Sequence, residues 1–345
     1  MTKSELYINR CIQIAEKGLF LASPNPCVGA VLVYNDEIIG EGFTSAFGGA
    51  HAEVNCINSV SFENQKIISE STLYVSLEPC SHQGKTPACS LLIIEKNIKK
   101  VVVGSLDPNP LVAGNGIKML KAKGISVEFG VLKSKCINAN KRFYTFHQKK
   151  RPYIILKWAQ TKNGYFSPLN GEQFWITNQY SKQLVHKWRS KEMSILVGTK
   201  TAEIDNPQLN SRLYNKKNPI RLVIDVDLKL NSELHIFDQK QETIIFNNLK
   251  NENSINLKYV KLDFKENIEN QILDYLYQSE INSVIIEGGL KTLQGFIKQN
   301  LWNEARILTG ENEIELGLKA PNLHGEIIEE YTLGKDSIKH IINTL

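Results

Sequence analysis

One histidine and two cysteines constrain this chain more than any other feature. His51 opens the segment His51-Ala52-Glu53, and Cys80 and Cys89 lie further on with eight residues between them. One imidazole and two thiolates would give Zn²⁺ three protein ligands and leave its fourth tetrahedral position open to water, as in catalytic zinc sites. We therefore predict one zinc ion per chain, held by His51, Cys80 and Cys89.

Other interpretations of these residues stay open at this point. The two cysteines could be unrelated buried thiols, or part of a closed structural zinc site. A closed site usually has four Cys or His ligands in two close pairs, which fits poorly with a distant histidine and an eight-residue gap. His82 could also serve as a fourth ligand, but Glu53 would then have no water to act on.

Glu53 follows His51 by two residues, a spacing that disfavours binding to the same ion but allows contact with a water bound to it. A His-x-Glu followed by Pro-Cys and a second Cys is the signature of zinc-dependent nucleobase deaminases, in which the glutamate carries protons. We predict Glu53 to be the catalytic residue of a hydrolytic deamination.

The composition is that of a globular protein. The 345 residues suffice for two domains, with 42% hydrophobic and 22% charged residues. A net charge of +5 without a dense basic run fits small anionic molecules at least as well as nucleic acids. Six scattered cysteines suit a reducing compartment, and neither a signal sequence nor a membrane span is recognisable. We expect a cytoplasmic homo-oligomer, a dimer or tetramer, that binds neither membrane nor nucleic acid.

The first half alternates helices and strands, which predicts a parallel or mixed sheet between helices. A helix capped by Ser4 is expected over 4–21, and a helix over 86–96 should carry Cys89 in its first turn. The other expected elements are strands at 30–34, 38–43, 73–77, 101–104 and 126–129, and helices at 51–59 and 116–123. The loop around Asn25 contains two prolines; taken alone it favours a plain helix-to-strand connection over an amide that contacts a heterocycle.

The second half begins after a helix or linker at 135–150, and we place the boundary between domains at 145 and 146. Expected strands are 153–159, 195–198, 220–225, 243–246 and 283–287, and expected helices are 179–191, 268–278 and 292–299. Residues 205–209 are expected to form a loop. A strand that ends at Gly288-Gly289 and is followed by a helix would place a phosphate at the N-terminus of that helix. The full dinucleotide fingerprint of a Rossmann domain is missing.

The first half resembles the deaminase half of the RibD family, the bifunctional enzymes of riboflavin biosynthesis. Cytidine and tRNA-adenosine deaminases usually have two residues between their cysteines, so the long insertion here sets this group apart. The motifs that carry the resemblance are Asn25-Pro26-x-Val28-Gly29, His51-Ala52-Glu53, Pro79-Cys80-Ser81-His82-x-Gly84-Lys85-Thr86-Pro87-x-Cys89 and Asp107-Pro108-Asn109-Pro110.

This resemblance implies a cytidine-deaminase-like α/β/α domain that acts on a diaminopyrimidinone carrying a ribosylamino 5-phosphate. Asn25 and Lys85 would bind that substrate, with the Lys85 ammonium near the phosphate as a point charge. The alternative for Lys85 is a solvated loop lysine. The sequence departs from the family at Phe43-Thr44, where a histidine is frequent.

The second half is similar to the reductase domain of the same family, which implies a dihydrofolate-reductase-like α/β fold and NADPH as cofactor. The landmarks are Lys157-x-Ala159, Gly171-Glu172 before Trp175-Ile176-Thr177, Arg189, Thr201, Asp205, Pro207, Arg212, Asp225 and Glu287-Gly288-Gly289. By this resemblance the cofactor residues are Ala159, Trp175, Thr201, Asp205, Gly289, Leu290, Lys291, Thr292, Leu293, Gln294 and Gly295. The substrate residues are Gln173, Arg189, Leu209, Arg212 and Glu287, with both arginines near the phosphate.

Plainer interpretations compete for two of these residues: Trp175 could be a core residue and Arg189 a charge on a helix surface. The sequence departs from the family pattern of the reductase domain at Asn163 and Asn206. The resemblance implies deamination followed by NADPH-dependent reduction of the ribosyl group to ribityl. The alternatives are a second domain that no longer reduces, and a deaminase for another pyrimidine or for a nucleic-acid base.

Overall fold

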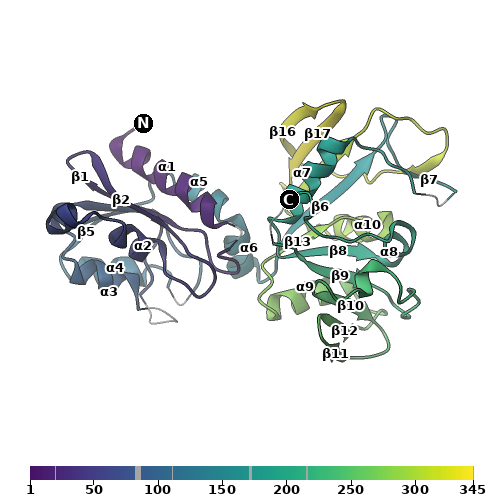
Figure 1. The fold of residues 1–345 in the computed structure, drawn as a ribbon, viewed down its shortest axis with the longest axis horizontal. Coiled ribbons are helices and arrows are strands. Elements are labelled where there is room, and N and C mark those ends of the chain that lie inside the picture. The colour runs from purple at the N-terminus through teal and green to yellow at the C-terminus, as the bar shows by residue number, and fades with distance from the viewer. Residues whose placement is uncertain (20, 82–86, 111, 171–172, 215–216, 345) are drawn as a thin grey trace. The chain divides into compact units, whose positions relative to one another are not determined.

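The computed structural model describes residues 1–19, 21–81, 87–110, 112–170, 173–214 and 217–344 (Figure 1). The chain divides into two compact units, Met1–Lys150 and Arg151–Leu345. The boundary expected from the sequence falls inside a helix, α6 (Lys141–Lys149). Each unit has its own sheet and its own buried core, and each is described by itself below.

The first unit contains a five-stranded mixed sheet. Its order is β2 (Glu37–Phe43), β1 (Gly29–Tyr34), β3 (Thr72–Leu77), β4 (Lys100–Ser105), β5 (Ser126–Phe129). β1 runs antiparallel to β2 and β3, and β3, β4 and β5 are parallel. The carboxyl ends of β3 and β4 therefore lie at the same edge of the sheet, and Cys80 follows β3 there.

Helices cover both faces of this sheet, because successive strand residues point to opposite faces. Val31 and Val33 pack against α1 (Lys3–Ala15) and α5 (Lys133–Ala139). Ala30 and Leu32 belong to the core shared with α2 (Ala52–Asn58), α3 (Cys89–Glu95) and α4 (Asn115–Ala122). Figure 1 shows α1 and α5 on one side of the strands and the other three helices on the opposite side. This is the α/β/α arrangement expected from the sequence.

The N-terminal helix differs from its prediction at both ends. Thr2, not Ser4, is its N-cap: Thr2 and Glu5 form a capping box in which each side chain bonds to the other residue's backbone N–H. The α-helix ends at Ala15 and continues as a short 3₁₀ helix, η1 (Glu16–Gly18), rather than reaching 21. A second 3₁₀ helix, η2 (Phe62–Glu70), joins α2 to β3. The helix expected over 86–96 begins at Cys89 itself.

The second unit contains a ten-stranded sheet in the order β11-β12-β10-β9-β8-β13-β6-β14-β17-β16. From β12 to β14 all neighbours are parallel, and β11, β17 and β16 are antiparallel additions. The strands are β6 (Tyr153–Gln160), β8 (Ser194–Gly198), β9 (Ile220–Ile224), β10 (Thr243–Asn247), β11 (Glu252–Ser254), β12 (Leu257–Lys261), β13 (Ser283–Ile286), β14 (Glu304–Thr309), β16 (Glu326–Leu333) and β17 (Asp336–Ile342).

Helices again cover both faces of the parallel part. Ile155 and Ile195 share a core with α7 (Gln179–Arg189) and α8 (Thr199–Asp205), while Ile154 and Leu196 share one with α9 (Ile268–Gln278) and α10 (Leu290–Lys298). A two-stranded ribbon, β7 (Tyr165–Pro168) with β15 (Gly317–Lys319), stands apart from the main sheet, and η3 (His235–Phe237) follows β9. The loops after β6, β8 and β13 open at one edge of the sheet.

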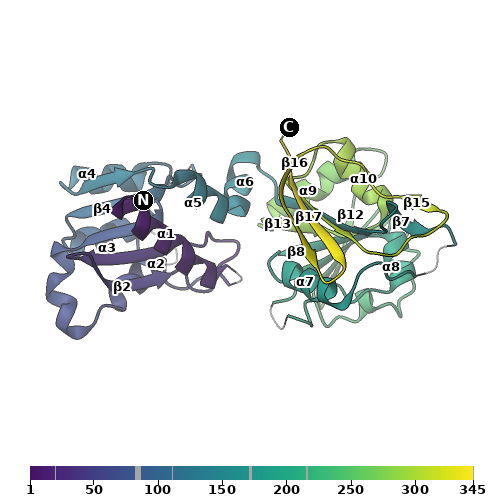
Figure 2. The same ribbon diagram turned by 90° about the horizontal axis from the view of Figure 1, so that it is seen from above.

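Several elements of this unit were not expected. Residues 205–209 were predicted as loop, but Asp205 is the last residue of α8. The strands after residue 300 were not predicted either. β16 is an edge strand with mostly exposed residues, which explains why its sequence lacks the apolar alternation of a half-buried strand. Figure 2 shows β16 and β17 as the yellow hairpin at the C-terminal end of the chain.

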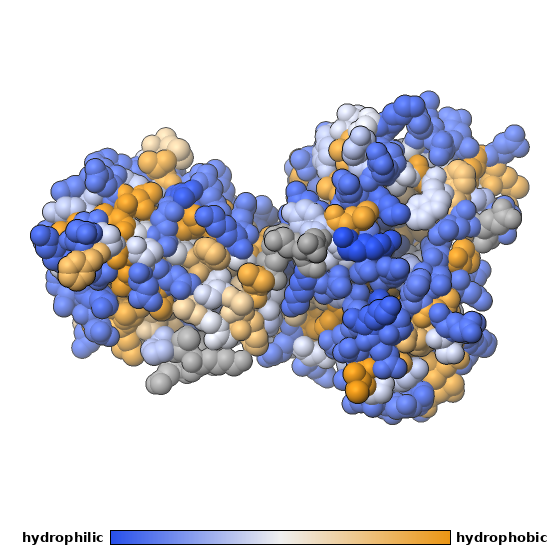
Figure 3. All heavy atoms as spheres, in the orientation of Figure 1, coloured by the Kyte–Doolittle hydropathy of each residue, from blue (hydrophilic) through white to orange (hydrophobic). Residues whose placement is uncertain are grey.

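The helices of the described residues can be compared with the length and apolar character of a membrane span. No helix there has the length and apolar character to cross a bilayer. On the face shown in Figure 3, hydrophilic side chains surround separate groups of apolar ones.

Candidate functional sites

The three predicted metal ligands come together in the first unit. His51 Nδ1 lies 3.3 Å from the sulfur of Cys89 and 3.6 Å from that of Cys80, and all three ligand atoms lie within 4.8 Å of one another. His51 is the N-cap of α2, Cys80 follows β3, and Cys89 begins α3. Residues far apart in sequence thus converge because two helices start where one strand ends.

These atoms fit a zinc ion. With Zn–S and Zn–N bonds of about 2.3 and 2.0–2.1 Å, a tetrahedral centre places its sulfur and nitrogen ligands about 3.6 Å apart. The backbone N–H of Cys89 donates to the Cys80 sulfur at 3.2 Å, which favours a thiolate there. The hydrogen bond from the Cys89 thiol lowers the pKa of Cys80 to about 4 and raises the pKa of Cys89.

Glu53 lies beside this cluster in the first turn of α2. Its side chain is almost fully buried, with 3% exposure. Burial, reinforced by the negative charge of Cys80, raises the pKa of Glu53 to about 7. A carboxyl group with such a pKa can both accept and release a proton near neutrality, which is what a general acid–base residue requires.

Glu78, which sequence reasoning did not single out, holds the loop that carries Cys80. Its buried carboxylate accepts hydrogen bonds from the backbone N–H groups of Asp107, Gly114 and Ile117, at 3.2, 2.9 and 3.2 Å. Gly116 lies so close to this loop that a Cβ there would come within 2.0 Å of the Pro79 carbonyl oxygen. The Pro79-Cys80 turn is thereby fixed against the start of α4.

The loop that contains Asn25 is held from two sides. The Asn140 side chain bonds to both the N–H and the carbonyl of Cys27, and the hydroxyl of Thr44 accepts from the Val28 N–H at 3.0 Å. The departure at Thr44 therefore has a role of its own in this chain, as a support for the loop. That Asn25 contacts a substrate stays a prediction. Lys85 and His82 lie outside the described residues.

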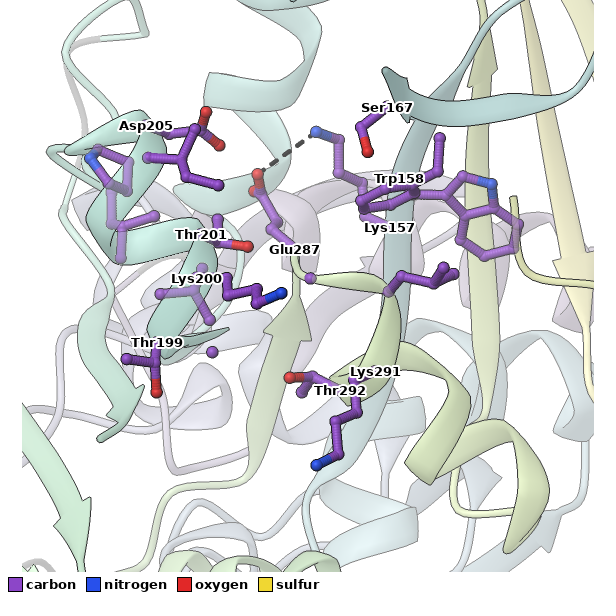
Figure 4. A pocket seen from close by; sticks show the side chains of 18 of the residues that line it. Lys157, Trp158, Ser167, Thr199, Lys200, Thr201, Asp205, Glu287, Lys291 and Thr292 are labelled. Atoms are coloured by element: carbon purple, nitrogen blue, oxygen red, sulfur yellow. Dashed lines mark hydrogen bonds and ion pairs between the residues drawn. The ribbon is translucent and has the colours of Figure 1, made fainter. Parts of the chain in front are cut away.

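The second unit contains a cavity of about 1240 Å³. Ligand pockets commonly have volumes of about 300–1,000 Å³, so this one has room for a dinucleotide and a substrate together. It lies at the edge of the sheet where β6, β8 and β13 end, and Figure 4 shows part of its lining. Among the expected residues the lining includes Ala159, Gln173, Trp175, Arg189, Thr201, Asp205, Leu209, Arg212, Glu287, Gly289, Leu290, Lys291, Thr292, Gln294 and Gly295.

One expected residue lies elsewhere. The side chain of Leu293 is fully buried in the core with α9 and β6, and it is not part of the cavity wall. Its neighbours Thr292 and Gln294 do line the cavity, so the helix turns this one position inward. Trp175 is 63% exposed, with the Lys182 ammonium 4.7 Å from its ring centroid, and is therefore not a core residue.

Glu287 lies at the centre of the cavity and carries an ion-pair network. Its side chain is 5% exposed and pairs with Arg189 at 2.8 Å. It also pairs with Lys157 at 3.4 Å, the contact drawn as a dashed line in Figure 4. Burial opposes ionisation of Glu287, but the charges of Arg189 and Lys157 outweigh it and lower its pKa to about 2. Arg189 is thus an internal ion-pair partner and not a helix-surface charge.

The glycine pair lies between β13 and the start of α10. Gly289 is the N-cap of that helix, no described side chain caps its first turn, and residues 289–292 line the cavity. Thr201 packs against the same turn: a Cβ on Gly288 would come within 2.8 Å of the Thr201 hydroxyl. In Figure 4, Thr199 and Thr201 from α8 face Lys291 and Thr292 from α10 across the cavity.

The two departures in this domain preserve local structure. Asn163 accepts from the Thr161 hydroxyl at 2.7 Å and donates to the Ile314 carbonyl at 2.8 Å. Asn206 ends α8 with φ +38° and accepts from the His235 N–H at 2.8 Å. Gly171 and Glu172, which also supported the resemblance, lie outside the described residues.

Sequence reasoning gave no site role to two cavity residues that lie beside the Glu287–Arg189 pair. Lys157 served only as a landmark, although its ammonium contacts Glu287. The sequence analysis assigns no role to His186, although this residue lines the cavity one helical turn before Arg189. The spacing of three residues on a predicted helix was the signal that could have revealed it.

Comparison with known proteins agrees with both sites. Residues 1–105 match the cytidine and deoxycytidylate deaminase zinc-binding region, and residues 152–310 match the RibD C-terminal domain. Riboflavin biosynthesis protein RibD of Aquifex aeolicus is 36% identical over 330 residues, covering 94% of this chain and 91% of its own length. The corresponding protein of Actinobacillus pleuropneumoniae is 38% identical over 293 residues, covering 82% and 77%.

This chain belongs to the RibD family. A crystal structure from Thermotoga maritima, described as a diaminohydroxyphosphoribosylaminopyrimidine deaminase/5-amino-6-(5-phosphoribosylamino)uracil reductase, has a TM-score of 0.90 and 33% identity, and covers 99% of this chain and 98% of its own. The structure of Acinetobacter baumannii RibD, form 1, also has a TM-score of 0.90, at 28% identity and 99% coverage of both chains. The chain is accordingly a bifunctional enzyme of riboflavin biosynthesis, with a zinc-binding deaminase domain and a reductase domain that uses NADPH.

Proposed function

We propose that the chain catalyses two consecutive steps on one phosphorylated pyrimidine. The first is the hydrolytic deamination of 2,5-diamino-6-(5-phosphoribosylamino)pyrimidin-4(3H)-one. The second is the NADPH-dependent reduction of the ribosyl group of the product to ribityl. The observation that carries the proposal is that one chain contains two sites. The first unit has a His-Cys-Cys cluster beside a buried glutamate, and the second unit has a cavity large enough for a cofactor.

In the deaminase domain, His51, Cys80 and Cys89 would hold the zinc and Glu53 would carry protons. Zinc, when bound there, supplies the Lewis acidity that lets water act as a nucleophile near neutral pH. Glu53, whose pKa burial raises to about 7, takes a proton from the attacking water and returns it to the departing amine. Ammonia then leaves and a carbonyl replaces the ring amine. Asn25 and Lys85 are proposed to bind the substrate.

In the reductase domain, the first N–H groups of α10 would bind a cofactor phosphate. The other proposed cofactor residues here are Thr201, Gly289, Leu290, Lys291, Thr292, Gln294 and Gly295, all of which line the cavity. Ala159, Trp175 and Asp205 are proposed to contact the cofactor, and Gln173, Leu209, Arg189, Arg212 and Glu287 the substrate. NADPH, when bound there, would supply a hydride for the reduction at the sugar C1′. Lys157 can supply the accompanying proton, because burial lowers the pKa of its ammonium and so makes it a better acid.

The coupled reaction tests this proposal. Purified protein is given the diamino substrate, and ammonia release and NADPH oxidation are followed in parallel. The wild type should release ammonia first and oxidise about one NADPH per ammonia. The Glu53→Gln variant should keep its zinc and fold but lose about 10²- to 10⁴-fold in ammonia release. Near-normal ammonia release by that variant would reject the mechanism, whereas ammonia release without NADPH oxidation would favour a second domain that no longer reduces.

The assignment of the deaminase to residues 1–145 and the reductase to 146–345 is likewise a proposal. It is supported by the separate cores of the two units. A fragment that ends at residue 150, so that α6 stays whole, should bind zinc and release ammonia without NADPH. A soluble, zinc-loaded fragment without activity would show that the deaminase needs the rest of the chain.

We further propose a cytoplasmic homo-oligomer, a dimer or tetramer, that binds neither nucleic acid nor membrane. The six cysteines are all free, as in reducing compartments. The edge strand β16 exposes Ile327 and Ile328 by about half, which supports association through that edge. Light scattering of the purified protein measures the assembly directly, and a monomer would contradict it.

A further inference from the structure

A buried histidine in the reductase cavity has no role so far. His186 lies on α7, three residues before Arg189, so that the two side chains lie on one face of the helix. Its side chain lines the cavity but is only 2% exposed. Its Nδ1 atom is buried without a hydrogen-bond partner in the described structure. Buried polar atoms normally have partners, so an unpartnered one in a cavity wall suggests that a ligand supplies the partner.

The charges around this ring are mainly positive. Burial is the main cause that lowers the pKa of His186 to about 4, and the charges of Arg189 from its own helix and Arg212 from the loop after α8 act in the same direction. Glu287 at the end of β13 and a hydrogen bond to the Asn210 backbone act in the opposite direction. Because the Asn210 contact occupies the other ring nitrogen, Nδ1 carries no proton when the ring is neutral.

Arg189 and Arg212 differ in how many of their N–H groups already bond to other residues. Arg189 uses three N–H groups, two on Glu287 and one on the Asn210 carbonyl, which leaves two of its five. Arg212 donates to the Asn210 side chain at 2.8 Å, and no carboxylate within the described residues pairs with it. The cavity wall formed by His186, Arg189 and Arg212 therefore has positive charge and free donors, but no anion of its own beyond Glu287.

We propose that His186 is a third ligand of the substrate phosphate, beside Arg189 and Arg212, and that its ring takes up a proton when the phosphate binds. This inference rests on the proposed reductase function. A phosphate oxygen offers only lone pairs, so an unprotonated Nδ1 would be repelled by it. A protonated Nδ1 donates a charge-assisted hydrogen bond instead. Without a ligand, burial and the two arginines keep the His186 ring neutral. The negative charge of a bound phosphate offsets both effects and so favours the protonated ring.

Uptake of a proton by the His186 ring determines how substrate binding changes with pH. The ring is neutral in the free enzyme above about pH 4 and protonated in the complex up to a higher pKa. Within that interval, binding consumes a proton and weakens as the pH rises. The KM of the phosphorylated uracil substrate should therefore increase with pH, whereas the turnover number at saturation should change little.

The first experiment compares wild type with His186→Asn and with Gln183→Asn. Asparagine keeps a neutral polar atom near the position of Nδ1 but cannot gain a proton. Gln183 is exposed on the same helix and provides the matched control. Near pH 7, His186→Asn should raise the KM about tenfold to a hundredfold, which is the usual contribution of a charged hydrogen bond to affinity. The KM of the variant should also no longer change with pH as that of the wild type does. A wild-type KM that is independent of pH, or a variant profile that parallels it, overturns the proposal.

A second measurement needs no variant, and its result is compared with the NADPH oxidation of the same wild-type protein. Wild-type protein with ¹⁵N-labelled histidine and saturating NADP⁺ is titrated with inorganic phosphate at pH 7, and the ring nitrogens are followed by NMR. The signal of the buried His186 should move from the neutral to the imidazolium position. If it does so while the enzyme oxidises no NADPH, the anion site stands and the proposed reduction fails. If NADPH is oxidised normally and no ring changes its protonation, the role of His186 fails and the proposed function stands.

Discussion

The Glu287 carboxylate receives two parallel hydrogen bonds from the Arg189 guanidinium, from Nε to one oxygen and from Nη2 to the other, each 2.8 Å long. This bidentate pair joins the end of β13 to the last turn of α7 across the cavity floor. With Lys157 added at 3.4 Å, two cations share one buried carboxylate. The positions of the Arg189 and Lys157 side chains in the reductase site therefore depend on the Glu287 carboxylate.

Removing that charge should be costly for the second unit. Glu287→Gln leaves Arg189 and Lys157 buried without a counter-charge, and breaking a buried ion pair usually costs about 3–5 kcal/mol. All four tryptophans of the chain lie in the second unit, at positions 158, 175, 188 and 302, so their fluorescence during urea unfolding reports on that unit alone. The variant should unfold at lower urea and oxidise no NADPH, yet still release ammonia. Unchanged stability with lost reduction would mean that Glu287 acts only on the substrate.

The same carboxylate gives a defined dependence of stability on pH. Its pKa is about 2 in the folded protein, against about 4.3 in an unfolded chain. Because the folded pKa is the lower one, the stabilisation is complete above the unfolded value and disappears as the pH falls through about 2. Its full size is about 3 kcal/mol. The difference in unfolding free energy between wild type and Glu287→Gln should be constant from pH 7 to about 5 and then shrink with acidification. A difference that stays constant down to pH 3 would contradict the low pKa.

The zinc assignment predicts a contrast between two cysteines. Cys80→Ser should lose most of the stoichiometric zinc, because serine does not replace a thiolate ligand. Cys136→Ser changes a fully buried thiol on α5, outside the metal cluster, and should keep its zinc. Elemental analysis of both purified proteins, with ammonia release as a second reading, decides the matter. One zinc per chain in Cys80→Ser would remove Cys80 from the ligand set.

What the sequence could predict was chemistry with fixed spacing. His51, Glu53, Cys80 and Cys89 were found because metal ligation and proton transfer demand particular side chains at particular separations. The cap of α1 was placed at Ser4 instead of Thr2, since both residues have capping hydroxyls and only the reciprocal bond from Glu5 distinguishes them. Leu293 was assigned to the cofactor with its neighbours, although the helix turns it into the core.

Other features depend on tertiary contacts that leave no local pattern. Nothing near Glu78 in sequence shows that three backbone N–H groups from 107–117 converge on it. Strand β16 was missed because it is exposed on both faces at the sheet edge. His186 was missed because its importance comes from burial beside Arg189 and from Arg212, which lies 26 residues further along the chain.

Arg212 is the residue on which the phosphate assignment can be tested most directly. It is exposed and paired only with the Asn210 side chain among described residues, so its replacement disturbs little of the fold. A guanidinium can give a phosphate two parallel hydrogen bonds, whereas an ammonium binds as a point charge. Arg212→Lys should therefore raise the KM of the substrate and lower kcat/KM about tenfold to a hundredfold, with NADPH binding unchanged by fluorescence titration. Arg10→Lys, which changes a half-buried arginine paired with Glu41 in the first unit, is the control for the same exchange away from the cavity and should leave both quantities unchanged. If NADPH affinity falls while the substrate KM stays constant, Arg212 binds a cofactor phosphate and not the substrate.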